Sequence, residues 1–132
     1  MNGDMETVLI ADDDEDILAL VDRALSESGY EVLLARDGAT ALATAREQKP
    51  ALALLDIAMP ELDGYEVTST LKSDPATMDM IVILFTARSE ASDVEKGYDA
   101  GADDYIMKPF TLKTLQNRVA AALARGTATA PR

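Results

Sequence analysis

Residues 51–64 read ALALLDIAMPELDG, a run of small and branched apolar residues that ends abruptly at Asp56. Such a run is typical of a strand buried on both faces of a parallel sheet. The segment MPELDG that follows is rich in turn formers, so we expect the chain to turn directly after the strand. In open parallel sheets, ligands bind outside the carboxyl ends of the strands. Asp56 therefore lies where a functional side chain is expected.

Further apolar runs of the same character lie on both sides of this one. The predicted strands are Thr7–Ala11, Glu31–Ala35, Ala51–Leu55, Met80–Phe85 and Tyr105–Met107. Between them, helical spacing of apolar residues predicts helices. These are a helix with Ile17, Leu20, Val21, Ala24 and Leu25, closed by Gly29; a second from Asp37-Gly38 with Leu42 and Ala45 inward; a third between Asp63-Gly64 and Asp74-Pro75; a fourth within Glu90–Asp99, stopped near Gly101; and a fifth after Pro109-Phe110, with Thr111 as N-cap and Leu112, Leu115, Val119 and Leu123 on one face. Short connections between alternating strands and helices imply right-handed crossovers, a parallel sheet and helices on both faces, which is an α/β fold.

Length and composition limit what the chain can do. Its 132 residues fit one domain, because domains of about 100 to 150 residues are the commonest size. The absence of cysteine and histidine excludes disulfides, thiolate nucleophiles, the usual zinc sites and imidazole catalysis. A formal net charge of −12 opposes direct binding to nucleic acid. The first residues, MNGDMETVLI, lack a signal-peptide pattern and no apolar run is long enough to cross a bilayer, so we expect a cytoplasmic protein without a membrane partner.

Charged and hydroxyl side chains follow most of the predicted strands, at the same edge of the sheet. Asp12 and Asp13 follow the first strand, Asp56 the third, Thr86 the fourth and Lys108 the fifth. Converging carboxylates repel one another unless a cation lies among them. A ligand set made only of oxygen atoms suits Mg²⁺, and we expect that Mn²⁺ can substitute. Asp56 is then placed to attack phosphorus, with Lys108 and Thr86 stabilising charge on the phosphoryl oxygens.

Each of these residues has a simpler structural interpretation when it is taken alone. An Asp after a strand is often only the N-cap of the next helix, which applies to Asp13 and Asp14. Asp56 can belong to a turn, Lys108 to the solvated surface and Thr86 to a strand end. Their coincidence at one edge of the sheet is what favours a functional site.

Segments covering nearly the whole chain resemble the receiver domain of two-component response regulators. They are VLIADDDEDIL, LLDIAMPELDG, ILFTA and GADDYIMKPF, in the order and spacing typical of that family. The resemblance covers residues 6–125 and leaves 126–132 as a tail or the start of a linker. It implies a flavodoxin-like (βα)5 sandwich with strand order 2-1-3-4-5. It also implies a signalling switch that catalyses only its own phosphorylation and dephosphorylation, rather than an enzyme.

The resemblance also implies which residues hold the phosphoryl group and the metal ion. Asp56 is the expected phosphoacceptor. Asp12 and Asp13 are expected to hold Mg²⁺, Asp13 more directly, together with the backbone carbonyl of Ala58. The phosphoryl donor is expected to be a sensor histidine kinase or a histidine phosphotransfer protein.

The remaining matched residues are implied to transmit the signal. Lys108 is expected to contact the phosphoryl oxygens and to be joined to Pro109 by a cis peptide bond, which is uncommon except before proline. Thr86 is expected to swing toward the phosphoryl group while Tyr105 rotates inward. The face made by the fourth helix, fifth strand and fifth helix is the expected output surface, which would act on a downstream effector protein or on an output domain not contained in this chain.

Two further hypotheses concern individual side chains. Ala58 and Arg88 flank the expected route of a hydrolytic water, so we expect them to tune the lifetime of the phosphoryl group. Asp103 or Asp104 of one molecule could pair with Arg118 of a second copy, which would give a phosphorylation-dependent homodimer.

Three alternative functions fit the residues less well. A haloacid-dehalogenase-type phosphatase needs a second Asp two residues after its nucleophile, where this chain has Ala58, and has its acidic pair after the lysine rather than before it. A flavin or nucleotide module needs a Gly, Ser or Thr loop after the first strand, whereas residues 12–16 are all acidic. A degenerate receiver that serves only as a scaffold would not need the acidic, hydroxyl and lysine side chains together.

Overall fold

The computed structural model describes residues 5–87 and 90–129, with side chains up to residue 125, and contains a five-stranded parallel sheet in the order β2-β1-β3-β4-β5. The strands are β1 (Thr7–Ala11), β2 (Glu31–Ala35), β3 (Leu52–Leu55), β4 (Ile81–Thr86) and β5 (Asp104–Met107). The helices are α1 (Glu15–Glu27), α2 (Gly38–Gln48), α3 (Gly64–Ser73), α4 (Ala91–Asp99) and α5 (Leu112–Thr129). This is the predicted (βα)5 architecture with the predicted strand order.

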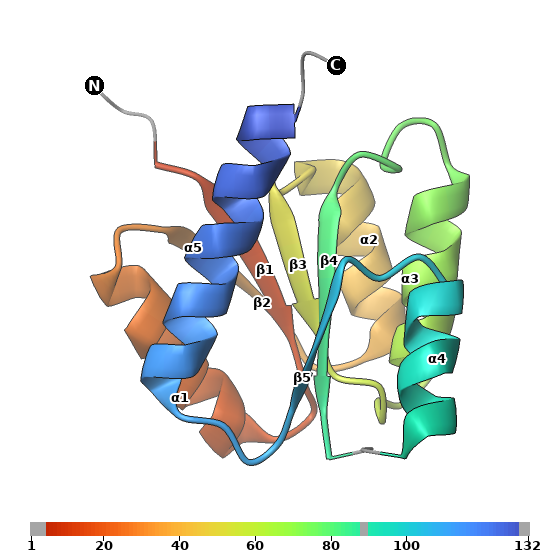
Figure 1. The fold of residues 1–132 in the computed structure, drawn as a ribbon, viewed down its shortest axis with the longest axis horizontal. Coiled ribbons are helices and arrows are strands. Elements are labelled where there is room, and N and C mark those ends of the chain that lie inside the picture. The colour runs from red at the N-terminus through yellow and green to blue at the C-terminus, as the bar shows by residue number, and fades with distance from the viewer. Residues whose placement is uncertain (1–4, 88–89, 130–132) are drawn as a thin grey trace.

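The sheet is the middle of three layers. In Figure 1, α1 and α5 lie against one face of the sheet and α2, α3 and α4 against the other. Alternate strand residues divide between the two faces: Leu9 and Leu84 join the core under α2 and α3, whereas Ile10 and Ile83 join the core under α1 and α5. Because successive side chains on a strand point to opposite faces, strands covered on both faces are apolar throughout.

Aspartates start the helices that follow β1, β2 and β3. The carboxylate of Asp14 accepts hydrogen bonds from the first turn of α1, and Asp37 caps α2. Asp63 caps α3 in a reciprocal arrangement with Glu66. The hydroxyl of Thr111 accepts a hydrogen bond from the backbone N–H of Thr114, as expected of the predicted cap of α5. Each cap satisfies backbone donors that the helix itself cannot pair, which ends each loop at a defined residue.

Several predicted boundaries and faces differ from the observed ones. β3 begins at Leu52 rather than Ala51, β4 spans Ile81–Thr86 rather than Met80–Phe85, and β5 begins at Asp104 rather than Tyr105. Leu20 is 53% exposed and Leu112 is 37% exposed, so neither belongs to the core face assigned to it. On α1 that face is set by Leu18, Val21 and Leu25, and Leu20 lies to one side of it.

The end of α5 overlaps the segment predicted to be a tail or linker. α5 runs to Thr129, so residues 126–129 are helical, and residues 130–132 lie outside the described part of the chain. The boundary at residue 126 stays a prediction.

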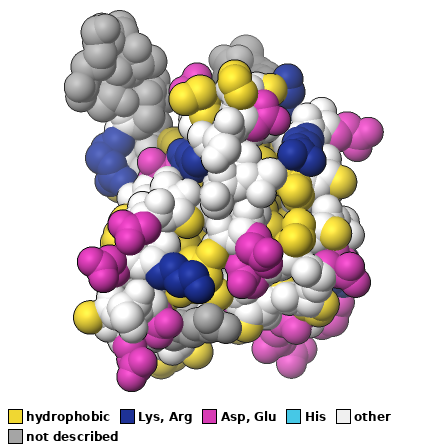
Figure 2. Space-filling view, turned by 90° about the vertical axis from the view of Figure 1, so that its right-hand side faces the viewer, with side chains coloured by type: hydrophobic (Ala, Val, Ile, Leu, Met, Phe, Trp, Pro, Cys, Tyr) yellow, Lys and Arg dark blue, Asp and Glu magenta, His cyan; other side chains and the backbone are white. Residues whose placement is uncertain are grey.

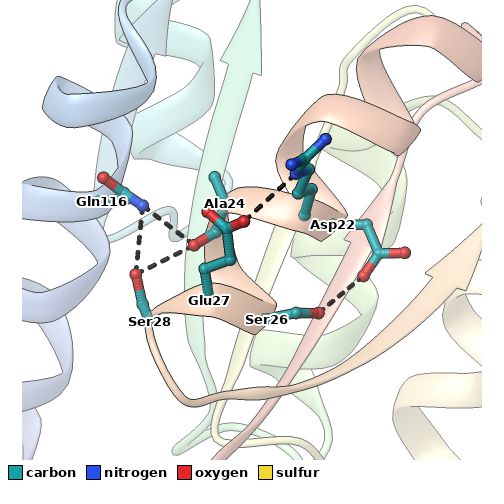
Figure 3. Close-up of polar contacts among 7 residues, drawn as sticks. Asp22, Ala24, Ser26, Glu27, Ser28 and Gln116 are labelled. Atoms are coloured by element: carbon teal, nitrogen blue, oxygen red, sulfur yellow. Dashed lines mark hydrogen bonds and ion pairs between the residues drawn. The ribbon is translucent and has the colours of Figure 1, made fainter.

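Polar contacts fasten α1 to α5 at the C-terminal end of α1. Figure 3 shows the side-chain amide of Gln116 on α5 reaching the carbonyl of Ala24 and the hydroxyl of Ser28, at 3.0 and 3.2 Å. The Ser28 hydroxyl donates to the same carbonyl. The backbone N–H of Ser28 donates to this carbonyl as well, so the side-chain bonds reinforce the C-terminal cap of α1. They hold this side of the molecule together away from the carboxyl ends of the strands.

The surface is acidic but not uniformly so. Figure 2 views the side on which α3 and α4 lie in Figure 1, and its acidic side chains are mixed with hydrophobic and basic ones. Across the described residues, the helices do not combine the length and the apolar character that crossing a bilayer requires.

Candidate functional site

The carboxyl ends of the strands lie at the bottom of Figure 1, and Asp12, Asp13, Asp56 and Lys108 meet at this edge. Asp56 follows β3 directly, and its backbone N–H donates to the carbonyl of Ala11 at the end of β1. Asp56 is only 5% exposed. Its position is therefore set by the two central strands of the sheet rather than by a free loop.

Asp12 and Asp13 follow β1 directly, near Asp56, and lie in different environments. Asp12 is fully buried, and its Oδ1 accepts a hydrogen bond from the backbone N–H of Asp14 at 2.9 Å. Asp13 is exposed to solvent. Of the two aspartates that could serve as a helix N-cap, Asp14 caps α1, whereas the carboxylate of Asp13 belongs to the acidic cluster.

Lys108 supplies the positive charge of the pocket. Its ammonium nitrogen lies 2.9 Å from Asp12 Oδ2 and 3.5 Å from Asp56 Oδ2. The same nitrogen lies 4.9 Å from the centre of the Phe85 ring, which gives the cation an aromatic face to rest on. The bond between Lys108 and Pro109 is cis, as predicted.

Thr86 and Tyr105 are the expected switch residues, and both are buried. Thr86 ends β4 and is 2% exposed, and its carbonyl accepts a hydrogen bond from the backbone N–H of Lys108 at 2.7 Å. Tyr105 lies on β5 and is 5% exposed. The ring of Tyr105 therefore already occupies an inward position in this structure.

The pKa of the Asp56 carboxyl group lies well above its ordinary value. Burial raises its pKa to about 6, and the neighbouring carboxylate of Asp12 acts in the same direction. The ammonium of Lys108 and the backbone N–H of Ala58 oppose this rise in pKa only in part. Burial and the adjacent carboxylate of Asp12 thus both disfavour the ionised form of Asp56.

The side chains present fit a hard divalent cation. Oxygen atoms of Asp12, Asp13 and Asp56 all lie within 4.8 Å of one another. Oxygen-only ligand sets with an open, solvent-facing side suit Mg²⁺, which usually keeps several of its waters. The raised pKa of Asp56 points the same way, because a cation in the pocket would offset both the burial and the repulsion by Asp12 that raise it.

Two glycines support the acceptor loop and were missed as site residues by sequence reasoning. A Cβ atom at Gly64 would lie 2.6 Å from the carbonyl oxygen of Asp56 and 2.8 Å from Cα of Ile57. A Cβ atom at Gly38 would lie 1.8 Å from the carbonyl oxygen of Leu62. The sequence places both glycines only at helix starts, and the close approach that requires them becomes visible only in three dimensions.

Two of the finer hypotheses meet the structure only in part. Ala58 is exposed beside Asp56, and Arg88 lies outside the described residues, so their influence on phosphoryl lifetime stays a prediction. Asp104 pairs with Arg118 of the same molecule, and Asp103 pairs with Lys72. An ion pair between two copies would have to break these internal pairs, so it also stays a prediction.

Comparison with known proteins gives a consistent family. The model of the response regulator receiver domain matches residues 8–120. The transcriptional regulatory protein PrrA of Mycobacterium tuberculosis is 47% identical over 123 residues, which cover 93% of this chain and 52% of PrrA. The alkaline phosphatase synthesis transcriptional regulatory protein PhoP of Bacillus subtilis is 40% identical over 124 residues, covering 94% of this chain and 51% of PhoP. The chain thus spans about half the length of these curated relatives.

Solved structures agree with this assignment. A CheY-like response regulator receiver domain protein from Methanospirillum hungatei has a TM-score of 0.88 at 30% identity, over 94% of this chain and 98% of that one. The receiver domain of the sensor histidine kinase PA1611 from Pseudomonas aeruginosa has a TM-score of 0.84 at 28% identity, over 91% and 98% of the two chains. That structure has a magnesium ion coordinated in its active site cleft.

Proposed function

Because this chain belongs to the response regulator receiver domain family, we propose that it accepts a phosphoryl group onto Asp56 in a Mg²⁺-dependent reaction. Phosphorylation then switches the face made by α4, β5 and α5. The observation that carries the proposal is the meeting of Asp12, Asp13 and Asp56 with the ammonium of Lys108 in one pocket. In this proposal residues 6–125 form the receiver and residues from 126 onward begin a tail or linker.

The transfer itself requires an ionised carboxylate and a good leaving group. An oxygen of Asp56 attacks the phosphorus of a phosphohistidine, the new P–O bond forms as the P–N bond breaks, and the electron pair leaves on the imidazole of the donor. With a pKa of about 6, Asp56 is mainly ionised at neutral pH. The donor histidine belongs to a sensor histidine kinase or a phosphotransfer protein, since this chain has no histidine.

Asp12, Asp13, Asp56 and the backbone carbonyl of Ala58 would hold the cation. Bound Mg²⁺, for which Mn²⁺ can substitute, supplies neutralisation of the carboxylates and of the phosphoryl oxygens. Asp13 is the most solvent-accessible of the acidic residues, so it can exchange water for the ion with the least rearrangement. Asp12, already bonded to Asp14 and Lys108, positions the others.

Phosphorylation changes the charges that surround Lys108 and Thr86. The new group adds about −1.5 to −2 charges and further acceptor oxygens. Lys108, now shared between Asp12 and Asp56, turns to the phosphoryl oxygens, and the hydroxyl of Thr86 follows. Thr86 ends β4, which pairs with β5, so its movement reaches Tyr105 and the output face.

The partners follow from the same role. The output face acts on a downstream effector protein or on an output domain, which accords with the chain spanning about half of PrrA and PhoP. The net charge of −12 argues against direct nucleic-acid binding by this chain. A phosphorylation-dependent homodimer through the output face would exchange the internal Asp104–Arg118 pair for an intermolecular one.

The proposal is tested by incubating the protein with acetyl phosphate, with Mg²⁺ or with EDTA, and measuring intact mass. We expect the mass of one phosphoryl group to appear only with Mg²⁺, and to be absent in Asp56→Asn. The control is Asp79→Asn, an exposed carboxylate in the loop before β4, which should be modified like the wild type. Modification that persists in Asp56→Asn, or that is independent of the cation, would contradict the proposal.

A further inference from the structure

Gly97 is the one buried residue of helix α4, and Val94 of the same helix packs, partly buried, against the core. The N-cap of α4, Glu90, makes no side-chain capping bond. The buried Tyr65 donates its hydroxyl to the carbonyl of Asp93, and the ammonium of Lys96 lies 4.7 Å from the Tyr65 ring centre. The ring of Tyr98 lies 6.5 Å from that of Tyr105, centre to centre. Gly97 is the position at which α4 meets the side chains of β4 and β5 without a side chain of its own.

The backbone of α4 does not itself call for glycine at this position. Gly97 is an ordinary helical residue without a positive φ, and glycine in the middle of a helix destabilises it relative to alanine. A Cβ atom at this position would lie 3.0 Å from Leu84 Cδ1, 3.0 Å from Tyr105 Cδ2 and 3.1 Å from Tyr105 Cε2. Glycine is needed at position 97 because the side chains of Leu84 and Tyr105 leave little room for a Cβ atom.

The ring in question is that of the expected switch residue. Leu84 and Tyr105 are paired in register between β4 and β5, and both belong to the core on the α4 side. Thr86 lies two residues beyond Leu84, so its side chain points to the same face of the sheet. The Tyr105 ring thus lies beside Leu84 of β4, the strand that also carries Thr86, and beneath Gly97 of α4.

We infer that Gly97 is a positioning residue of the switch: its missing side chain leaves the space that the inward ring of Tyr105 occupies beneath α4. A methyl group at residue 97 excludes that ring position or lifts α4 from the sheet. Since the ring and α4 belong to the proposed output face, Gly97 sets how readily the output responds to Asp56. This last step rests on the proposed function, whereas the steric coupling of Gly97 to Tyr105 does not.

The steric coupling is tested by a double-mutant cycle in equilibrium unfolding. Overpacking outweighs helix propensity, so Gly97→Ala is expected to lower the folding constant by roughly 3- to 30-fold. In a Tyr105→Ala background, where Leu84 can move into the vacated space, the same change should raise it by roughly 2- to 5-fold. Ser92→Ala, on the exposed side of α4, is the control for helix propensity. Equal effects of Gly97→Ala in both backgrounds would overturn the inference, as would an unfolded Gly97→Ala protein that Tyr105→Ala fails to rescue.

The role in switching is tested by ¹⁹F NMR of protein labelled with 3-fluorotyrosine. The resonance that is lost in Tyr105→Phe is assigned to Tyr105. Gly97→Ala should move the Tyr105 signal toward that of exposed tyrosine. In the presence of Mg²⁺, Gly97→Ala should also weaken beryllofluoride binding at least about 5-fold relative to Ser92→Ala. The reason is that binding at the phosphoryl site and the inward position of the Tyr105 ring favour each other. An unmoved Tyr105 signal with unchanged beryllofluoride affinity would overturn the inference. Failure of the wild type to bind beryllofluoride would instead remove the proposed function and leave the unfolding cycle standing.

Discussion

Asp12 and Asp56 lie in one pocket but are stabilised differently. Both oxygens of Asp12 have partners, the backbone N–H of Asp14 and the ammonium of Lys108. Asp56 is buried without equivalent compensation, and its pKa rises to about 6. At the scale of single residues, the carboxylate proposed as nucleophile is therefore the one that most needs a cation or a phosphoryl group to complete its surroundings.

Asp56→Asn is expected to stabilise the protein in metal-free buffer. The native pKa of about 6 lies above the ordinary value of 3.8, so between these pH values the folded state binds more protons than the unfolded state. Stability therefore falls as pH rises through this window. Removing the charge should add on the order of 2 kcal/mol at pH 8 and almost nothing at pH 3.5. Urea unfolding in EDTA at both pH values measures this, with Asp79→Asn as the control. An equal effect at both pH values would contradict it.

Lys108→Met is expected to destabilise the apo protein. Without the ammonium, the buried carboxylates of Asp12 and Asp56 face each other uncompensated. Removing one partner of a buried ion pair costs about 3–5 kcal/mol, and the cost is lower here because Lys108 is partly exposed. The exposed residue Lys113 on α5 provides a matched control, Lys113→Met. Thermal unfolding at pH 7.5 in EDTA should separate the two variants. Indistinguishable melting temperatures would show that Lys108 contributes little to the pocket.

At the scale of elements, the acceptor loop between β3 and α3 is held by backbone contacts. The N–H of Gly64 donates to the carbonyl of Ile57, and Gly38 at the start of α2 donates to Pro60. Glu61 in the same loop adopts a φ of 74°, a conformation unusual outside glycine. The loop is thus shaped by the starts of two helices, which fixes where Asp56 emerges.

Gly64→Ala is expected to move the acceptor loop and so impair phosphorylation. The added methyl would overlap the backbone of Asp56 and Ile57, and such overpacking typically costs about 1–3 kcal/mol. The variant should accept phosphoryl groups from acetyl phosphate more slowly than wild type, measured by intact mass over time. Ala76→Gly, in the loop after α3, is the control for a general loss of stability. Wild-type kinetics in Gly64→Ala would contradict the assigned role of the glycine.

Most of the fold could be predicted from particular elements of the sequence. The strands β1 and β2 have the predicted bounds, because their apolar residues coincide with their paired residues. β4 runs one residue past its apolar run to Thr86 because the ladder depends on backbone pairing with β5, not on side-chain polarity. Asp12, Asp13, Asp56 and Lys108 lie together as predicted because each follows a strand at the same edge of the sheet. Gly38, Gly64 and Gly97 were not found as supporting residues, since their signal is the approach of segments distant in sequence.

At the scale of the whole molecule, the two sides of the sheet are built differently. The α1 and α5 side is fastened through Gln116, Ala24 and Ser28. On the other side, α4 has one buried residue. A signal from the pocket is therefore expected to move α4 more readily than α1, because elements with few buried contacts reorganise at the lowest free-energy cost.

Mg²⁺ is expected to stabilise the folded protein as a specific ligand. Binding to the native state alone adds about 2.7 kcal/mol when the free ion is a hundred times its dissociation constant. The melting temperature should therefore rise with Mg²⁺ in the wild type and not in Asp13→Asn, which changes an exposed side chain of the cluster. Equal shifts with NaCl at matched ionic strength would show that only general screening is at work.

The account depends most on Asp56, rather than a neighbouring carboxylate, carrying the phosphoryl group. Borohydride reduces an acyl phosphate to an alcohol, so treatment after incubation with acetyl phosphate and Mg²⁺ marks the modified residue for peptide mapping by mass spectrometry. We predict homoserine at position 56 and unchanged aspartate at Asp12 and Asp13. Reduction at Asp12 or Asp13, or none in a protein shown to bind Mg²⁺, would contradict the central claim.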